Sequence, residues 1–157
     1  MIGYISVEIE NEKHTGGIII VDDRGIPVEF KYTEPVQPTQ LQKIIYGKSL
    51  EEYLHVEIIA KSLLSKVENK PAVFLTNDMK LIEAGEEVFY ITRTVDDSTA
   101  EEGEYVISAP GMKYRLIGKG ALSEETLKEI ENFAEHFDIL EPFQRLHKAL
   151  VFVCSNM

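Results

Sequence analysis

The chain has 157 residues, 44% of them hydrophobic, and a formal net charge of −11 from 16 Lys and Arg against 27 Asp and Glu. This length is sufficient for one buried core, so we expect residues 1–157 to form a single globular domain. The acidic excess disfavours non-specific contact with nucleic acid or an anionic membrane surface, because like charges repel.

The apolar runs fall well short of the roughly 20 residues of a membrane-spanning helix, and the N-terminus lacks a basic stretch followed by an apolar one. We therefore expect a soluble cytoplasmic protein. The single cysteine, Cys154, cannot form an internal disulfide, and its sequence neighbours do not activate it. The charged fraction of 27% is rich in Glu and Lys, a composition common in thermophile proteins.

Three strands are predicted in the first 32 residues. Ile5, Val7 and Ile9 alternate with polar residues, which indicates a strand with one buried face. Residues 17–21 are continuously apolar and β-branched, which favours a central strand covered on both faces. Alternation resumes over residues 26–32, after a turn at Asp22 and Asp23. The order predicts a three-stranded antiparallel meander.

Residues 25–47, GIPVEFKYTEPVQPTQLQKIIYG, join this meander to the first helix. Pro35 and Pro38 remove two backbone donors and predict a stiff surface connector. Thr39 and Gln42 fit a capping box, and Gly47 ends a helix of about two turns. The block resembles one in a family of small bacterial proteins of unassigned function, over about the first half of the chain. The resemblance brings no functional residue.

A second helix is predicted from about residue 49 to residue 66. Ser49 and Glu52 offer another capping box at its start. Its apolar positions cover most of the circumference, so we expect it to pack centrally across the meander. His55 falls on the remaining polar side, where a solvated histidine is the simplest interpretation. The main apolar stripe consists of Val56, Ile59, Ala60, Leu63, Leu64 and Val67.

The second half predicts four more strands and further helices. A strand over residues 71–76, a short helix capped by Asn77 or Asp78 and a strand over residues 88–92 form one unit, parallel or antiparallel. Residues 95–103 indicate an exposed loop, and residues 105–108 and 112–117 a hairpin. Helices follow from Ser123 and from Glu141, the last ending helical or extended. The fold class is α+β, with mixed α/β as the alternative.

The segment FLTNDMKLIEAGEEVFYITR, residues 74–93, places Asp78 just beyond a strand, where open α/β sheets bind ligands. It resembles the late acidic segment of PIN-type nucleases, a resemblance that implies Mg²⁺ or Mn²⁺ held by several carboxylates. Asp22, Asp23 and Glu83 are the further candidate ligands. The competing interpretations are a helix cap at Asp78 and a turn at the Asp22 pair.

Other polar residues give weaker signals. His136 and His147 are not spaced as the i, i+4 pair of a helical zinc site. The glycines beside His14 and around Lys119 lack the spacing of a phosphate loop or a dinucleotide fingerprint. We therefore expect no cofactor and name no catalytic residue.

From these observations we expect a non-catalytic domain that binds a protein partner or a ligand. Tyr32, Lys43, Tyr46 and Lys48 form a locally basic, aromatic patch that would suit an acidic protein. In the competing interpretation, the two tyrosines close the core beneath the connector. Self-association through an exposed sheet edge is also open. The alternative function is a metal-dependent hydrolase or nuclease that uses Asp78 with other carboxylates.

Overall fold

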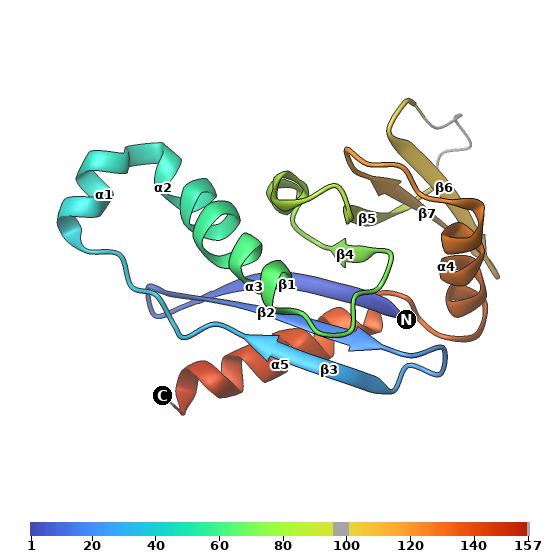
Figure 1. The fold of residues 1–157 in the computed structure, drawn as a ribbon, viewed down its shortest axis with the longest axis horizontal. Coiled ribbons are helices and arrows are strands. Elements are labelled where there is room, and N and C mark those ends of the chain that lie inside the picture. Colours follow the sequence, from blue (N-terminus) through green and yellow to red (C-terminus); the bar gives the residue numbers. More distant parts are fainter. Residues whose placement is uncertain (96–100, 157) are drawn as a thin grey trace.

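A seven-stranded mixed sheet forms the centre of the computed structural model, which describes residues 1–95 and 101–156 (Figure 1). The strands lie in the order β3-β2-β1-β4-β5-β7-β6, and helices cover both faces. The predicted α+β fold class is confirmed. The strands are β1 (Ile2–Glu10), β2 (Lys13–Val21), β3 (Pro27–Tyr32), β4 (Phe74–Thr76), β5 (Val88–Thr94), β6 (Glu104–Ala109) and β7 (Met112–Ile117).

The N-terminal meander is confirmed. β2 pairs antiparallel with β1 on one side and with β3 on the other. Its side chains alternate between two hydrophobic clusters: Ile18 and Ile20 face one, and Ile19 and Val21 face the other. The continuous apolar run of this strand therefore reflects burial on both faces.

β4 pairs in parallel with both β1 and β5, so the antiparallel alternative for the unit formed by these two later strands is wrong. The short connection between β4 and β5 is long enough for a parallel crossover because its only helical element is a 3₁₀ segment, η3 (Met79–Ala84). From β1 the chain fills one side of the sheet with β2 and β3, then returns to the other side with β4 and β5. The topological switch of the sheet consequently lies between β1 and β4. The predicted hairpin is confirmed as β6 and β7, with Gly111 at positive φ in its turn.

Two layers of helices enclose the sheet. α4 (Glu124–His136) and α5 (Glu141–Ser155) pack on one face, and the run from α1 to α3 crosses the other face together with η3. α5 is helical to Ser155, which decides between the two predicted endings. The run consists of α1 (Gln40–Tyr46), η1 (Gly47–Ser49), α2 (Leu50–Glu52), η2 (Tyr53–Ala60) and α3 (Lys61–Lys66).

The central helix exists, but its middle is a π-helix over Tyr53–Ala60. Most of the predicted stripe is buried, including Val56, Ile59 and Leu63. The i to i+5 hydrogen bonds of the π-helix nevertheless change the rotation per residue, which alters the direction of the neighbouring side chains. His55 is therefore only 2% exposed, not solvated as predicted, whereas Ile58 is 44% exposed. The capping box at Thr39 is confirmed, but Ser49 makes no cap: its hydroxyl donates to the Tyr46 carbonyl within a continuous helical run.

Two further expectations concern an exposed loop and membrane-spanning helices. The predicted loop over residues 95–103 falls largely on residues 96–100, which lie outside the described residues. Within the described ranges, none of the helices has both the length and the apolar character needed to cross a lipid bilayer.

We expect Gly16→Ala to destabilise the fold by about 1–3 kcal/mol. A Cβ at Gly16 in β2 would lie 2.1 Å from Cγ2 of Ile59, where η2 crosses the strand. Urea unfolding of the two single variants and of Gly16→Ala with Ile59→Ala measures the coupling. The double variant should lose less stability than the sum of its parts; strict additivity would show that the close approach does not limit this position.

Candidate functional site at the carboxyl ends of β1 and β4

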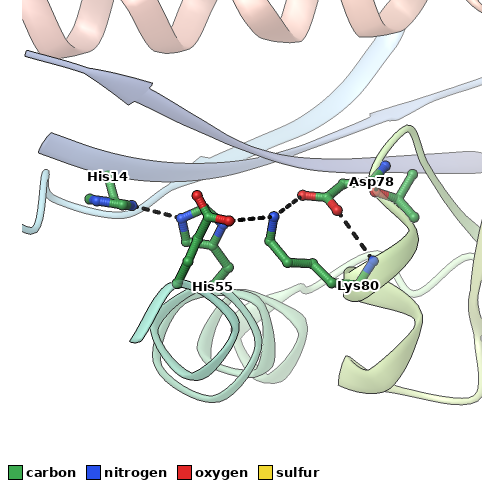
Figure 2. A network of polar contacts seen from close by, with 6 residues as sticks. His14, His55, Asp78 and Lys80 are labelled. Carbon is green, nitrogen blue, oxygen red and sulfur yellow. Dashed lines mark hydrogen bonds and ion pairs between the residues drawn. The ribbon is translucent and has the colours of Figure 1, made fainter. Parts of the chain in front are cut away.

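Polar side chains from three separate segments meet at the carboxyl ends of β1 and β4. In open α/β sheets, ligands bind outside the carboxyl ends of the strands beside the topological switch. Figure 2 shows the group, which lies between the sheet and the helical run and which we call the edge network. It consists of His14 from β2, Glu51 from α2, His55 from η2, Asp78 after β4 and Lys80 from η3.

The two histidine rings of the edge network contact each other directly. Nδ1 of His14 lies 2.7 Å from Nε2 of His55, and the rings meet edge to face. His14 stands opposite Ile9 near the end of β1 and is partly exposed. His55 is buried beneath it, and its Nδ1 has no hydrogen-bond partner among the described residues. A buried nitrogen without a partner costs about 1–3 kcal/mol, so it requires a physical reason.

Burial and neighbouring charge keep both histidines neutral. Burial lowers the pKa of His55 from the ordinary 6.5 to about 4, and the positive charge of Lys80 acts in the same direction. The pKa of His14 is also lowered, first by burial and then by Lys43 and Lys80, against the opposing charge of Glu51. Each ring is therefore an uncharged donor and acceptor at neutral pH.

Lys80 lies between two carboxylates. Its Nζ is 2.9 Å from Oδ2 of Asp78 and 3.4 Å from Oε2 of Glu51. Asp78 also caps η3, because its Oδ1 accepts the backbone N–H of Lys80 at 3.2 Å. Burial opposes the charge of Lys80, but the hydrogen bond and charge of Asp78, together with Glu51, raise the pKa of its ammonium. The ammonium thus stays charged.

The edge network does not fit the divalent cation that the nuclease hypothesis from the sequence implies. Such a cation needs several oxygen or imidazole ligands converging on one point. Within residues 1–95 and 101–156, no three His, Cys, Asp or Glu side chains are grouped to hold a metal ion. Glu51 and Asp78, the carboxylates beside the histidine pair, both bind the ammonium of Lys80. A positive charge from the protein itself already occupies the position between them.

A second polar pair flanks the same edge on the α5 face of the sheet. Oε1 of Glu8 in β1 lies 2.9 Å from Nδ1 of His147 in α5. Both residues line a pocket of about 420 Å³ together with Asn77 and Lys148. The carboxyl edge therefore carries ionisable groups on both faces of the sheet.

The other carboxylates predicted as metal ligands lie elsewhere. Asp22 follows Val21 at the amino-terminal end of β1, away from Asp78 at the carboxyl end of β4. Its Oδ1 accepts the backbone N–H groups of residues 24 and 26, which lowers its pKa and defines the predicted turn. Asp23 is beside it, and Glu83 pairs with Lys119. Asp78 and the Asp22–Asp23 pair do not share one cation.

The residues of the predicted aromatic and basic patch lie at the surface, and two of them contact side chains outside the patch. Tyr32 and Tyr46 are 44% and 38% exposed, so neither closes the core. Tyr46 stacks on Tyr53, and Lys43 pairs with Glu12 at 3.7 Å. Lys48 is exposed in η1.

Sequence reasoning missed most of the edge network. The sequence identifies Asp78 from its position after a strand, but it gives no role to His14, and His55 is predicted to be solvated. The one usable signal was the position of His55 between Leu54 and Val56 in a helix that is apolar over most of its circumference. A histidine there is surrounded by buried neighbours on both sides.

Comparison with known proteins identifies the fold. No protein-family model and no curated protein sequence matches the chain. Endonuclease V from Bacillus subtilis superposes with a TM-score of 0.56 and 12% sequence identity, covering 99% of this chain and 82% of that one. Endonuclease V from Ciona intestinalis, in complex with a 24mer DNA containing an inosine followed by a ribo-adenosine, superposes with a TM-score of 0.50 and 13% identity, covering 99% and 85%. The chain shares the endonuclease V fold.

This finding contradicts two expectations from the sequence. We predicted a non-catalytic domain that acts through protein–protein interaction or ligand binding, yet the solved structures with this fold are nucleases. We also predicted that nucleic acid is disfavoured, yet one of those structures is a complex with DNA. The physical reason is that a net charge of −11 is a sum over the whole molecule. Contact with a strand depends on the local charges along a few ångströms of surface.

Replacing Lys80 should create a cation site at a place where the described residues form none. Lys80→Met keeps the aliphatic stem but frees two carboxylates beside His55, so we expect Mn²⁺ to raise the melting temperature of this variant and not of the native protein. Lys61→Met is the matched control, because Lys61 forms an exposed ion pair with Glu57 at 2.9 Å. An equal Mn²⁺ shift in the native protein would show that the carboxylates already hold a metal.

His55 should make the fold sensitive to acid. Its pKa in the folded state is about 4, below the 6.5 of the unfolded chain, so its contribution is complete above pH 6.5 and is lost as the pH falls to 4. We expect His55→Leu to lose less stability than the native protein over this range, by up to about 3 kcal/mol. Urea unfolding at both ends of the range measures the difference. Parallel losses in the two proteins would contradict the assignment.

Proposed function

We propose that this chain is a nuclease that binds a nucleic-acid strand along the carboxyl ends of β1 and β4 and cleaves its phosphodiester backbone. The observation that carries the proposal is the endonuclease V fold over 99% of the chain, with an ionisable network at its topological switch. We assign the activity to the cytoplasm, where single-stranded RNA is abundant.

The charges at this edge of the sheet support contact with a short stretch of strand. Lys80 belongs to the edge network, Lys43 acts electrostatically on His14, and Lys148 lines the pocket on the α5 face. These three lysines stand on both faces of the sheet, among the carboxylates of Glu8, Glu51 and Asp78. Such a surface suits contact with a few phosphates rather than a long electrostatic track.

The chemistry available in the edge network is acid–base and electrostatic. Neutral imidazoles exchange protons near neutral pH, and an ammonium stabilises negative charge that develops on a phosphate in the transition state. These are the requirements of phosphodiester cleavage, in which a nucleophile is deprotonated while charge accumulates on the phosphate oxygens.

Binding of a fluorescent single-stranded oligonucleotide tests the proposed surface. With about three phosphates neutralised, the logarithm of the binding constant should fall with the logarithm of salt concentration with a slope of roughly −2. Lys43→Glu with Lys148→Glu should weaken binding and move the slope toward zero.

The matched control is Lys61→Glu with Lys128→Glu, which makes the same change of charge on α3 and α4. Equal losses in the two double variants would mean that net charge alone governs binding. A native protein that neither binds nor cleaves DNA or RNA would overturn the proposed function.

A further inference from the structure

β3 lies at one edge of the sheet, and within the described residues β2 is the one strand that pairs with it (Figure 1). The backbone N–H of Thr33 donates to the Gly16 carbonyl at 2.9 Å, so Thr33 directs its hydrogen-bonding groups toward β2. This direction alternates from residue to residue along an antiparallel pair. The N–H and C=O groups of Tyr32 and Phe30 therefore point away from β2, where another strand can pair with them.

An apolar surface adjoins this open edge. Phe30 lies opposite Ile19, whose side chain faces the hydrophobic cluster beneath α5, so Phe30 shares that face of the sheet. α5 contacts β1 and β2, and it leaves the side chains of Val28, Phe30 and Tyr32 exposed. The rings of Phe30 and Tyr32 lie 5.4 Å apart. Exposed apolar side chains beside outward-pointing backbone groups form a surface that stabilises a further strand.

Two opposite charges stand close together on the other face of β3. The carboxylate of Glu29 accepts the backbone N–H groups of residues 68 and 69 at 3.0 and 2.8 Å. Lys31 lies 3.5 Å from the carboxylate of Glu68. These contacts position Glu29 and Lys31 beside the edge, and both side chains remain partly exposed. A strand that pairs with β3 therefore meets one negative and one positive charge, two residues apart on one face.

We propose that the occupant of this edge is a second copy of the chain, paired antiparallel to β3 around a two-fold axis at Phe30. The axis places each Glu29 opposite Lys31 of the second copy, so two oppositely charged pairs face each other across it. An axis at Glu29 or at Lys31 would instead place two like charges opposite each other. An axis between residues would set outward-pointing backbone groups against inward-pointing ones. Of the axes within residues 29–31, the one at Phe30 alone satisfies both the charges and the hydrogen bonds.

The same axis determines the remaining contacts. The two Phe30 residues face each other and exchange both backbone hydrogen bonds, and Val28 stands opposite Tyr32 of the second copy. A bulge beside Val28 and the missing N–H of Pro35 limit the regular pairing to about five residues. Such an interface is small, so we expect a weak dimer with a dissociation constant of about 1 μM or more.

The inference does not rest on the proposed function. In the strand order, β1 and β4 are separated from the open side of β3 by β2. Pairing at β3 therefore leaves the carboxyl ends of β1 and β4 accessible in both copies.

Charge reversal tests the pairing through a mixture of two variants. Glu29→Lys puts two positive charges on the strand and Lys31→Glu puts two negative ones, so each variant's homodimer should be weakened by roughly tenfold. A one-to-one mixture sets opposite charges against each other again, and sedimentation equilibrium should find a heterodimer about tenfold tighter than either homodimer. Thermal unfolding shows beforehand that each variant is folded. A merely structural effect of either substitution would not be reversed by mixing.

The matched control reverses an ion pair away from the edge. Glu57 and Lys61 form an exposed pair at 2.9 Å on the helical run. Glu57→Lys, Lys61→Glu and their mixture should all dimerise as the native protein does.

Cysteine crosslinking tests the register. Facing residues of a hydrogen-bonded pair have Cα atoms about 5.5 Å apart, within the range of a disulfide. Phe30→Cys should therefore form a disulfide-linked dimer under mild oxidation. Tyr32→Cys should form none, because Tyr32 faces Val28 and the two copies of residue 32 lie more than about 12 Å apart. The native chain, whose single Cys154 is buried, is the control.

Three outcomes overturn the inference. A native protein that stays monomeric up to about 1 mM would show that the edge does not pair with a second copy. Equal crosslinking through residues 30 and 32 would indicate random collision rather than one register. A native dimer that neither charge reversal at β3 weakens would have its interface elsewhere. None of these outcomes concerns cleavage of nucleic acid, so the nuclease proposal stands or falls separately.

Discussion

Parallel pairing of β1 with β4 is the constraint on which the site depends. It places Ile5 opposite Thr76, so segments far apart in the chain end at the same edge of the sheet. Parallel neighbours cannot be joined by a tight turn, and the required crossover is the helical run from α1 to α3. That run carries Glu51 and His55 across one face of the sheet, and the chain leaving β4 carries Asp78 and Lys80 to the same face. One pairing therefore assembles three segments into one network.

Much of the fold could be predicted from the sequence because its signals are local. Alternation specifies the meander, Thr39 with Gln42 specifies the start of α1, and Ser123 specifies the start of α4. The π-helix could not be predicted, because its apolar pattern also satisfies an ordinary helix. The direction of β4 and β5 is set by what each strand packs against, not by its own residues. Both failures are cases in which tertiary packing overrides the local pattern.

The site could be predicted only where a single residue stands next to a recognisable boundary. Asp78 follows a strand, which was sufficient to identify it. His14, His55 and Lys80 become a unit only through strand order and helix rotation, neither of which can be derived from residue spacing. Lys80 also changes the interpretation of Asp78. The carboxylate suggested a metal ligand in the sequence, but in the structure its negative charge is paired with the Lys80 ammonium. The role of this carboxylate therefore could not be assigned without knowing which side chain it pairs with.

The edge network is not explained by its contribution to stability. Leucine at position 55 would extend the apolar cluster around Ile59 and Leu63, whereas histidine leaves a buried nitrogen unpartnered. A partly buried ion pair such as that of Lys80 contributes little net stability once desolvation is counted. The same burial that keeps His55 neutral is outweighed at Lys80 by two carboxylates, which keep it charged. An unpartnered buried imidazole beside an ion pair that adds little stability is a departure from packing for stability alone, and such departures are expected at functional sites.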